Sequence, residues 1–131
     1  MLTKEVPTIA IVPEEMLSLS QKVEKWVYQL CESLEQNYQQ SYPNSYHRKE
    51  FTMELGRKYW KIKEYDVRDG KRYGGGVHAF IDRNTGQVYK PASYKSPAKH
   101  VRYDMRIINN RERLHNPNYT DWAGSYLYLR G

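Results

Sequence analysis

One long apolar stripe constrains the fold of this chain more than any other feature. Apolar side chains recur at intervals of three and four residues, with charged residues between them, at Met16, Leu19, Val23, Trp26, Val27, Leu30 and Leu34. This spacing is typical of an amphipathic helix that packs one face on a core. Pro13, followed by two glutamates, favours a helix start there. Pro43 predicts an end near Tyr38 or Gln40.

The apolar pattern changes to a period of two after Phe51, which is typical of half-buried strands. We expect strands over residues 51–55, 58–63, 77–81, 87–90 and 125–129. Asp82 to Gly86 predicts a tight hairpin turn with Gly86 at positive φ. Asp69-Gly70 and the run Gly74-Gly75-Gly76 bracket a predicted turn, in which the glycine run would be flexible. Residues 1–12, with an apolar alternation over residues 8–12, predict an edge strand or an arm that packs on a second subunit.

A second helix is expected from Ser96-Pro97 to about Leu114, since serine is a good N-cap and proline is tolerated in the first turn. One of its faces would carry the apolar residues Val101, Met105 and Ile108. The opposite face would carry Lys99, Arg102, Arg106, Asn109 and Arg113. The predicted class is therefore α+β, a small antiparallel sheet of about four or five strands packed with a long N-terminal helix and a second, basic helix.

Length and composition favour one domain over residues 1–131, because no linker divides the chain. Residues 1–70 hold ten Lys and Arg against eleven Asp and Glu, and residues 71–131 hold eleven against four. Such an excess of cations in one half favours anionic partners. We expect a cytoplasmic protein with no membrane span and with Cys31 as a reduced, packed thiol.

The residue types argue against most catalytic sites. One cysteine and four scattered histidines do not form a zinc pattern, so we expect no metal and no cofactor. General acid–base pairs among Glu54, Glu64, Asp66 and Asp82 stay open, although surface charge is the commoner reason for carboxylates on strands. We therefore expect a binding protein and not an enzyme.

The segment from Val88 to Arg106 interleaves cations with tyrosines around the expected start of the second helix. Its cations are Lys90, Lys95, Lys99, Arg102 and Arg106. Unpaired N–H groups at a helix start favour anions, and tyrosine faces can stack a base. The segment therefore predicts an anion site with Tyr89, Tyr94 or Tyr103 as stacking partners. The alternative is a solvated basic helix face after an ordinary loop.

The same segment resembles small phage-encoded proteins with the pattern FxDxxTG–V–YKPASxKxPAK–xxR, and the resemblance extends loosely over residues 56–128. The matching residues are Phe80, Asp82, Thr85, Gly86, Val88, Tyr89, Lys90, Pro91, Ala92, Ser93, Lys95, Pro97, Ala98, Lys99 and Arg102. The group is similar to viral nucleotide sponges of the Thoeris and CBASS anti-defence type. The resemblance implies a homo-oligomer in which Phe80 stacks a base and the cations hold phosphates.

The leading hypothesis is that the protein sequesters a cyclic nucleotide or ADP-ribose-type immune signal in the host cytoplasm without cleaving it. The expected ligand-binding residues are Phe80, Lys90, Tyr94, Lys95, Lys99, Arg102, Arg106 and Asn109. A minor virion or assembly protein and a nonspecific nucleic-acid-binding protein are the alternatives. The second of these would lose affinity steeply with salt.

Overall fold

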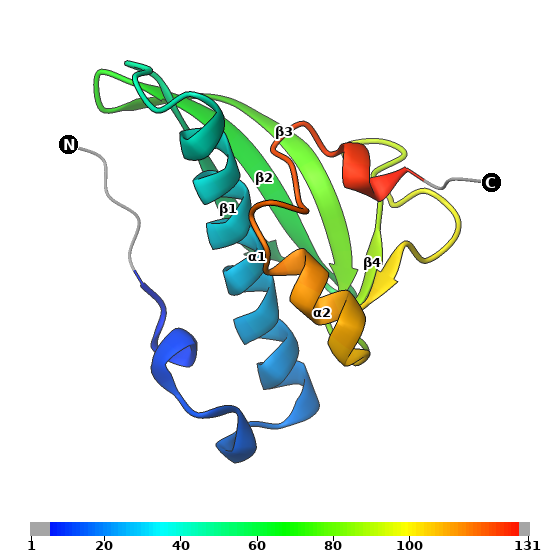
Figure 1. The fold of residues 1–131 in the computed structure, drawn as a ribbon. Coiled ribbons are helices and arrows are strands. Elements are labelled where there is room, and N and C mark those ends of the chain that lie inside the picture. The colour runs from blue at the N-terminus through cyan, green and yellow to red at the C-terminus, as the bar shows by residue number, and fades with distance from the viewer. Residues whose placement is uncertain (1–5, 129–131) are drawn as a thin grey trace.

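The computed structural model describes residues 6–128, in which one long helix lies across an antiparallel sheet (Figure 1). The helix α1 spans Leu19–Ser41, and a short helix α2 spans Ile108–Leu114. The strands are β1 (Arg48–Leu55), β2 (Tyr59–Arg68), β3 (Lys71–Asp82), β4 (Gln87–Tyr89) and β5 (Tyr103–Asp104). They are ordered β1-β2-β3-β4-β5, with each neighbouring pair antiparallel. The predicted α+β class is confirmed.

Helix α1 begins six residues later than Pro13, where the sequence predicted its start. Ser18 forms a capping box, because its N–H donates to Gln21 Oε1 (2.9 Å) and its hydroxyl accepts from the Gln21 N–H (3.4 Å). This reciprocal pair satisfies two backbone donors at the true helix start. The acidic residues after Pro13 instead form a 3-10 turn, Glu14–Met16, in which Met16 is exposed.

The N-terminal segment is not the predicted strand, because Thr8–Ile11 forms a 3-10 helix. Two side chains of α1 hold this segment in place. Lys25 Nζ donates to the Val12 carbonyl (2.6 Å), and Trp26 Nε1 donates to Glu14 Oε1 (2.8 Å). These contacts replace the ladder bonds that a strand would make. Residues 1–5 of the predicted arm lie outside the described residues.

The predicted turn is confirmed at Asp69 and Gly70, which both have positive φ, but it does not extend to the glycine run, which lies inside β3. The pairing of β2 with β3 shifts register twice, which leaves Gly75 and His78 as extra residues in β3. Such bulges bend a strand and re-aim side chains. Gly74 and Gly75 have φ values of 96° and 103°, which glycine adopts most easily.

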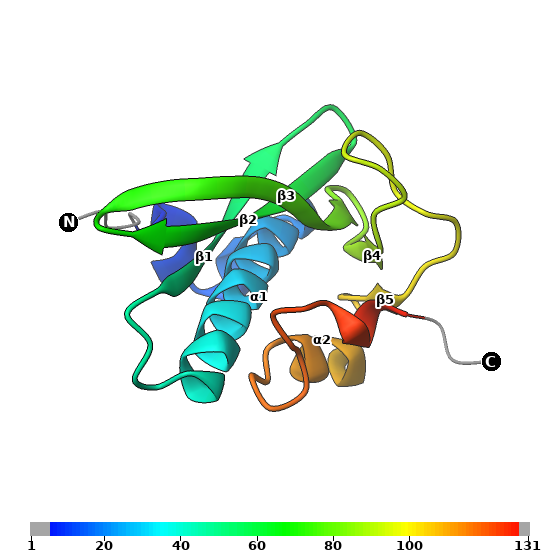
Figure 2. The ribbon, with the colours of Figure 1, turned by 90° about the horizontal axis from the view of Figure 1, so that it is seen from above.

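The apolar core lies between α1 and the sheet. Alternate residues of the strands, including Phe51, Ile62 and Ile81, point toward α1 and are completely buried. Both helices lie on this side, which we call the inner face (Figure 2). The opposite side, the outer face, carries no helix. Phe51 lies on β1, which is an edge strand of the sheet, and its backbone N–H donates to Glu35 Oε2 of α1 (2.8 Å).

The predicted helix over 96–114 is wrong for its first twelve residues. Tertiary backbone bonds hold this segment, since the Ala98 N–H donates to the Lys90 carbonyl (2.7 Å) and the Arg102 N–H to the Val88 carbonyl (2.8 Å). His100 has a φ of 75°, which no right-handed helix accepts. The predicted apolar face is also wrong, because Met105 is buried while Val101 and Ile108 are exposed.

The C-terminal strand predicted over 125–129 is a 3-10 turn over Ser125–Leu127 that packs Tyr126 and Leu127 into the core. Leu129 lies outside the described residues. The hairpin turn at Asp82 to Gly86 is confirmed. Gly86 has a φ of 80°, and Asp82 Oδ1 accepts from the N–H groups of Asn84 (2.8 Å) and Thr85 (3.2 Å). Within residues 6–128, no helix has both the length and the apolarity needed to cross a bilayer.

Candidate ligand-binding face of the sheet

A row of side chains crosses four strands on the outer face. The register aligns Glu54 of β1 with Lys61 of β2, Lys61 with Phe80 of β3, and Phe80 with Tyr89 of β4. These residues alternate with the buried ones, so they point away from α1. Tyr59 packs edge-on against Phe80 (5.8 Å between ring centres) and Tyr89 (5.9 Å). The outer face therefore has an aromatic layer of its own.

Phe80 cannot serve as the exposed base platform that the resemblance implied. Its side chain is 2% exposed, since Tyr59, Tyr89 and Lys61 cover it. The exposed ring on this face is Tyr94, with 52% of its surface accessible. The Tyr94 ring is also where two cations meet, because Lys61 Nζ lies 4.2 Å and Lys63 Nζ 5.3 Å from its centre.

A closed turn after β4 brings Tyr94 and Lys95 onto this face. Pro91 and Pro97 form an isolated bridge, and the N–H groups of Ala92 and Ser93 donate to the Ser96 carbonyl (3.0 and 3.2 Å). Ser93 Oγ accepts from the N–H groups of Lys95 (3.3 Å) and Ser96 (3.2 Å). The serines and prolines of the motif therefore form a compact loop that contains Tyr94 and Lys95.

We call this cluster the outer-face patch, and its members are Arg57, Lys58, Tyr59, Lys61, Lys63, Tyr94 and Lys95. A shallow depression of about 300 Å³ is lined by five of these residues, Arg57, Lys58, Tyr59, Lys61 and Lys95, together with Glu54, Gly56 and Phe80. Lys63 pairs with Glu54 (3.3 Å). A hydrogen bond to the Tyr94 side chain, and another to Glu54, raise the pKa of Lys63 above its ordinary value, although burial opposes them.

The other four cations of the patch have no carboxylate partner among residues 6–128. They are Arg57, Lys58, Lys61 and Lys95. Lys58 lies over the Tyr59 ring (5.4 Å), and Lys61 also lies over Phe80 (5.7 Å). Cations held over ring faces keep their charge and their hydrogen-bond donors available to a ligand. The patch can therefore hold an anion beside a flat ring.

The remaining predicted site residues are not brought into this patch. Arg102 is used by the backbone, because its Nε donates to the Leu127 carbonyl (2.7 Å) and its Nη1 to the carbonyls of Lys99 (2.6 Å) and His100 (2.5 Å). Lys99 is exposed in the same segment as Arg102, and Asn109 is exposed on α2. The predicted anion site at a helix start does not exist, since no helix starts at Ser96.

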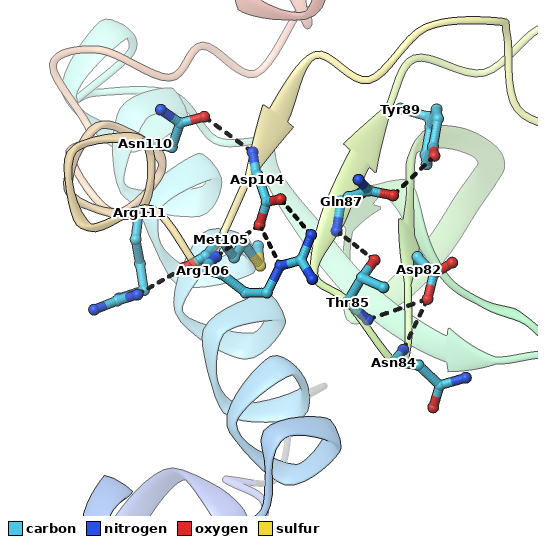
Figure 3. A network of polar contacts seen from close by, with 10 residues as sticks. All are labelled: Asp82, Asn84, Thr85, Gln87, Tyr89, Asp104, Met105, Arg106, Asn110 and Arg111. Carbon is cyan, nitrogen blue, oxygen red and sulfur yellow. Dashed lines mark hydrogen bonds and ion pairs between the residues drawn. The ribbon is translucent and has the colours of Figure 1, made fainter.

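Arg106 and Lys90 have partners of their own. Figure 3 shows the Arg106 guanidinium folded onto Asp104, with Nη2 2.7 Å from Oδ2 and Nε 3.0 Å from Oδ1. This hydrogen bonding lowers the pKa of Asp104. Lys90 lies on the inner face, where its Nζ is 4.8 Å from the centre of the Tyr128 ring. Of the eight predicted residues, the structure gathers Phe80, Tyr94 and Lys95.

The strand carboxylates that could have formed an acid–base pair are mostly engaged elsewhere. Glu54 pairs with Lys63, Asp66 pairs with Lys49 (3.0 Å), and Asp82 holds the hairpin turn (Figure 3). Glu64 alone lines a separate hollow with His78. Within residues 6–128, no three His, Cys, Asp or Glu side chains are grouped closely enough to hold a metal ion.

The lysines of β2 are the site residues that the sequence reasoning missed. A usable signal was present, since the alternation Lys58-Tyr59-Trp60-Lys61-Ile62-Lys63 places Lys61 and Lys63 on the side away from Ile62. The net charge of residues 1–70 does not reveal these lysines, because eleven Asp and Glu balance ten Lys and Arg there.

Comparison with known proteins identifies one family. The model of a family of unknown function, DUF7717, matches residues 11–129. A search of curated proteins found no match, and neither did a search of solved structures.

Proposed function

This chain belongs to the DUF7717 family, and we propose that it binds an anionic, nucleotide-type ligand on the outer-face patch and holds it without cleaving it. One observation carries the proposal. The exposed Tyr94 ring lies beside Lys61 (4.2 Å) and next to Lys95 in the chain, and neither lysine has a carboxylate partner within residues 6–128. A flat ring beside unpaired ammonium groups matches a base joined to phosphates.

Size and composition of the depression support the same ligand class. Its volume of about 300 Å³ is at the lower end of the range for small-molecule pockets. In the proposed pose the base stacks on the exposed surface of Tyr94, and Lys61 and Lys95 hold the phosphates. Arg57 borders the depression and can hold a phosphate with two parallel hydrogen bonds.

The biological role is capture of a signal nucleotide. The resemblance to viral nucleotide sponges supports a cyclic nucleotide or an ADP-ribose-type ligand. Because the depression is shallow, we expect a second copy of the chain to close it, so the active form is a homo-oligomer. The outer face carries no helix that would prevent such an approach (Figure 2).

The test is a ligand panel of cyclic dinucleotides, cyclic trinucleotides and ADP-ribose isomers, read by melting temperature and by calorimetry. A ligand that binds only the native state raises the melting temperature of the wild type. Lys61→Ala/Lys95→Ala should abolish that shift. Lys22→Ala/Lys71→Ala removes the same charge outside the patch and should keep it.

Three outcomes would redirect the proposal. Binding only to polynucleotides, with affinity that falls steeply as salt rises, would assign the patch to nonspecific nucleic-acid binding. No binding of any nucleotide, with the protein present at fixed copy number in purified particles, would indicate a virion or assembly protein. Recovery of a hydrolysed ligand after incubation with Mg²⁺ would make the protein an enzyme.

A further inference from the structure

A second hollow lies on the inner face, separated from the outer-face patch by the sheet. We call it the His78 pocket. Its volume is about 150 Å³, and the polar side chains that line it are Glu64, His78, Lys90 and Tyr128. His78 is the extra residue where Ile62 pairs with Ala79 and Lys63 with Val77. Bulges are over-represented beside functional sites because they re-aim one side chain.

His78 forms one wall of this pocket as a neutral imidazole. It is 6% exposed, and burial lowers its pKa to about 4. Its Nε2 lies 2.8 Å from the Tyr126 hydroxyl. Its Nδ1 has no hydrogen-bond partner among residues 6–128, and Glu64 Oε2 lies 4.0 Å from it. That carboxylate favours the tautomer with the proton on Nδ1, in which Nε2 accepts from Tyr126.

Glu64 and Lys90 bring opposite charges to the pocket without pairing. The Glu64 side chain is 34% exposed and accepts no hydrogen bond from the residues that the structure describes, and burial raises its pKa. Lys90 Nζ lies 4.8 Å from the centre of the Tyr128 ring, and its nearest acceptor is the Pro91 carbonyl at 3.5 Å. Half-buried charges with unmet hydrogen-bonding capacity are costly unless a ligand completes them.

The charges and the size together define a class of ligand. A lone anion would be repelled by Glu64, and a lone amine by Lys90. A cavity of about 150 Å³ holds a molecule of about six heavy atoms, the size of benzene. We propose that the His78 pocket binds a small zwitterion of the α-amino acid class, with the ligand ammonium at Glu64 and the ligand carboxylate at Lys90.

The experiment compares L-alanine with two analogues that each lack one charge, propionate and ethylamine. The His78 imidazole signals of the full chain are followed by NMR during each titration. L-Alanine should give a saturable shift, and each analogue should bind at least about tenfold more weakly, because each loses one charge-assisted contact. Glycine and L-serine should bind as L-alanine does.

Two variants and one control complete the test. Glu64→Gln and Lys90→Met should each weaken L-alanine binding about tenfold or more. Lys61→Ala/Lys95→Ala should leave it unchanged, which separates this pocket from the outer-face patch. Propionate or ethylamine binding as tightly as L-alanine would overturn the zwitterion assignment. No saturable shift with any of the three amino acids, in a wild type whose melting temperature they also leave unchanged, would overturn the proposal.

Discussion

The arginines of the C-terminal segment and the lysines of the outer-face patch carry the same charge but do different work. Arg102 donates to three backbone carbonyls, and Arg106 is paired with Asp104. Lys61 and Lys95 have no carboxylate partner in the described part of the chain, and Lys61 lies beside the exposed Tyr94 ring. The arginines are committed to the fold, whereas the lysines remain available to a ligand.

This difference shows that the number of charges does not locate a binding site. The C-terminal half holds eleven Lys and Arg against four Asp and Glu, and the first seventy residues hold ten against eleven. Even so, the patch draws Arg57, Lys58, Lys61 and Lys63 from the half with more acids. What decides availability is the partner that each cation meets after folding.

Arg102→Ala should have the largest effect, on stability. The loss of three charge-assisted hydrogen bonds at a half-buried position should lower the free energy of unfolding by about 3 kcal/mol. Urea denaturation measures this. Arg102→Lys keeps the charge but not the planar fork, and it should recover less than half of the loss. Wild-type stability in Arg102→Ala would show that the hydrogen bonds of Arg102 do not stabilise the fold.

Acidification tests the fold without touching the cations. Burial lowers the pKa of His78 and of His115 to about 4, below the ordinary value of 6.5. Stability is therefore full above pH 6.5 and falls as the pH drops toward 4, because the unfolded chain takes up protons first. Each histidine should cost about 1.4 kcal/mol between pH 7.5 and 5.5. Urea titrations at both pH values measure the sum.

The control for that experiment removes one of the two buried histidines. His115→Gln leaves His78 as the one buried histidine of this pair, so it should remove about half of the pH dependence. A flat profile in the wild type would mean that neither buried histidine resists protonation.

Tyr94→Ala should separate binding from stability. Stacking of a base is worth about 1–3 kcal/mol by alanine substitution, so nucleotide affinity should fall about tenfold. The unfolding free energy should change by less than about 0.5 kcal/mol, because the ring is half exposed. Calorimetry measures the nucleotide affinity, and urea denaturation measures the unfolding free energy. Tyr94→Phe keeps the ring and should bind normally, and equal losses in both variants would make the hydroxyl, not the ring, the important group.

Arg106→Ala should have the smallest effect. The urea midpoint should not change measurably, because the Arg106–Asp104 pair is on the surface. The pKa of Asp104 should rise toward its ordinary value once the guanidinium is gone, and NMR titration of the carboxyl carbon measures it. Loss of nucleotide binding in this variant would show that Arg106 contacts the ligand, as the sequence predicted.

Local patterns predicted the elements whose stability is mainly local. The stripe from Val23 to Leu34 is buried on α1, and Asp82 with Gly86 forms the hairpin turn. The segment from Ser96 to Ile107 has helical spacing, but its N–H groups find carbonyls on β4 and Lys90 instead. Those partners are distant in sequence, so no local propensity could indicate them.

The site was predictable in part for the same reason. Tyr94 and Lys95 are in a compact motif whose loop forms through nearby serines and prolines, and the sequence identified them. Lys61 joins them only because β2, β3 and β4 pair in one register. The role of Arg102 depends on the Leu127 carbonyl, twenty-five residues away. Nothing around Arg102 in the sequence separates a structural guanidinium from a ligand-binding one.

The hydrogen bond from the Phe51 N–H to Glu35 has a consequence for crowded conditions. An edge strand with unpaired N–H groups is a template on which another chain can add and polymerise. Here a charged carboxylate from α1 occupies the middle of the β1 edge, and an incoming strand would have to displace it and bury its charge. The Glu35 carboxylate therefore opposes the growth of a sheet from one molecule into the next through the β1 edge.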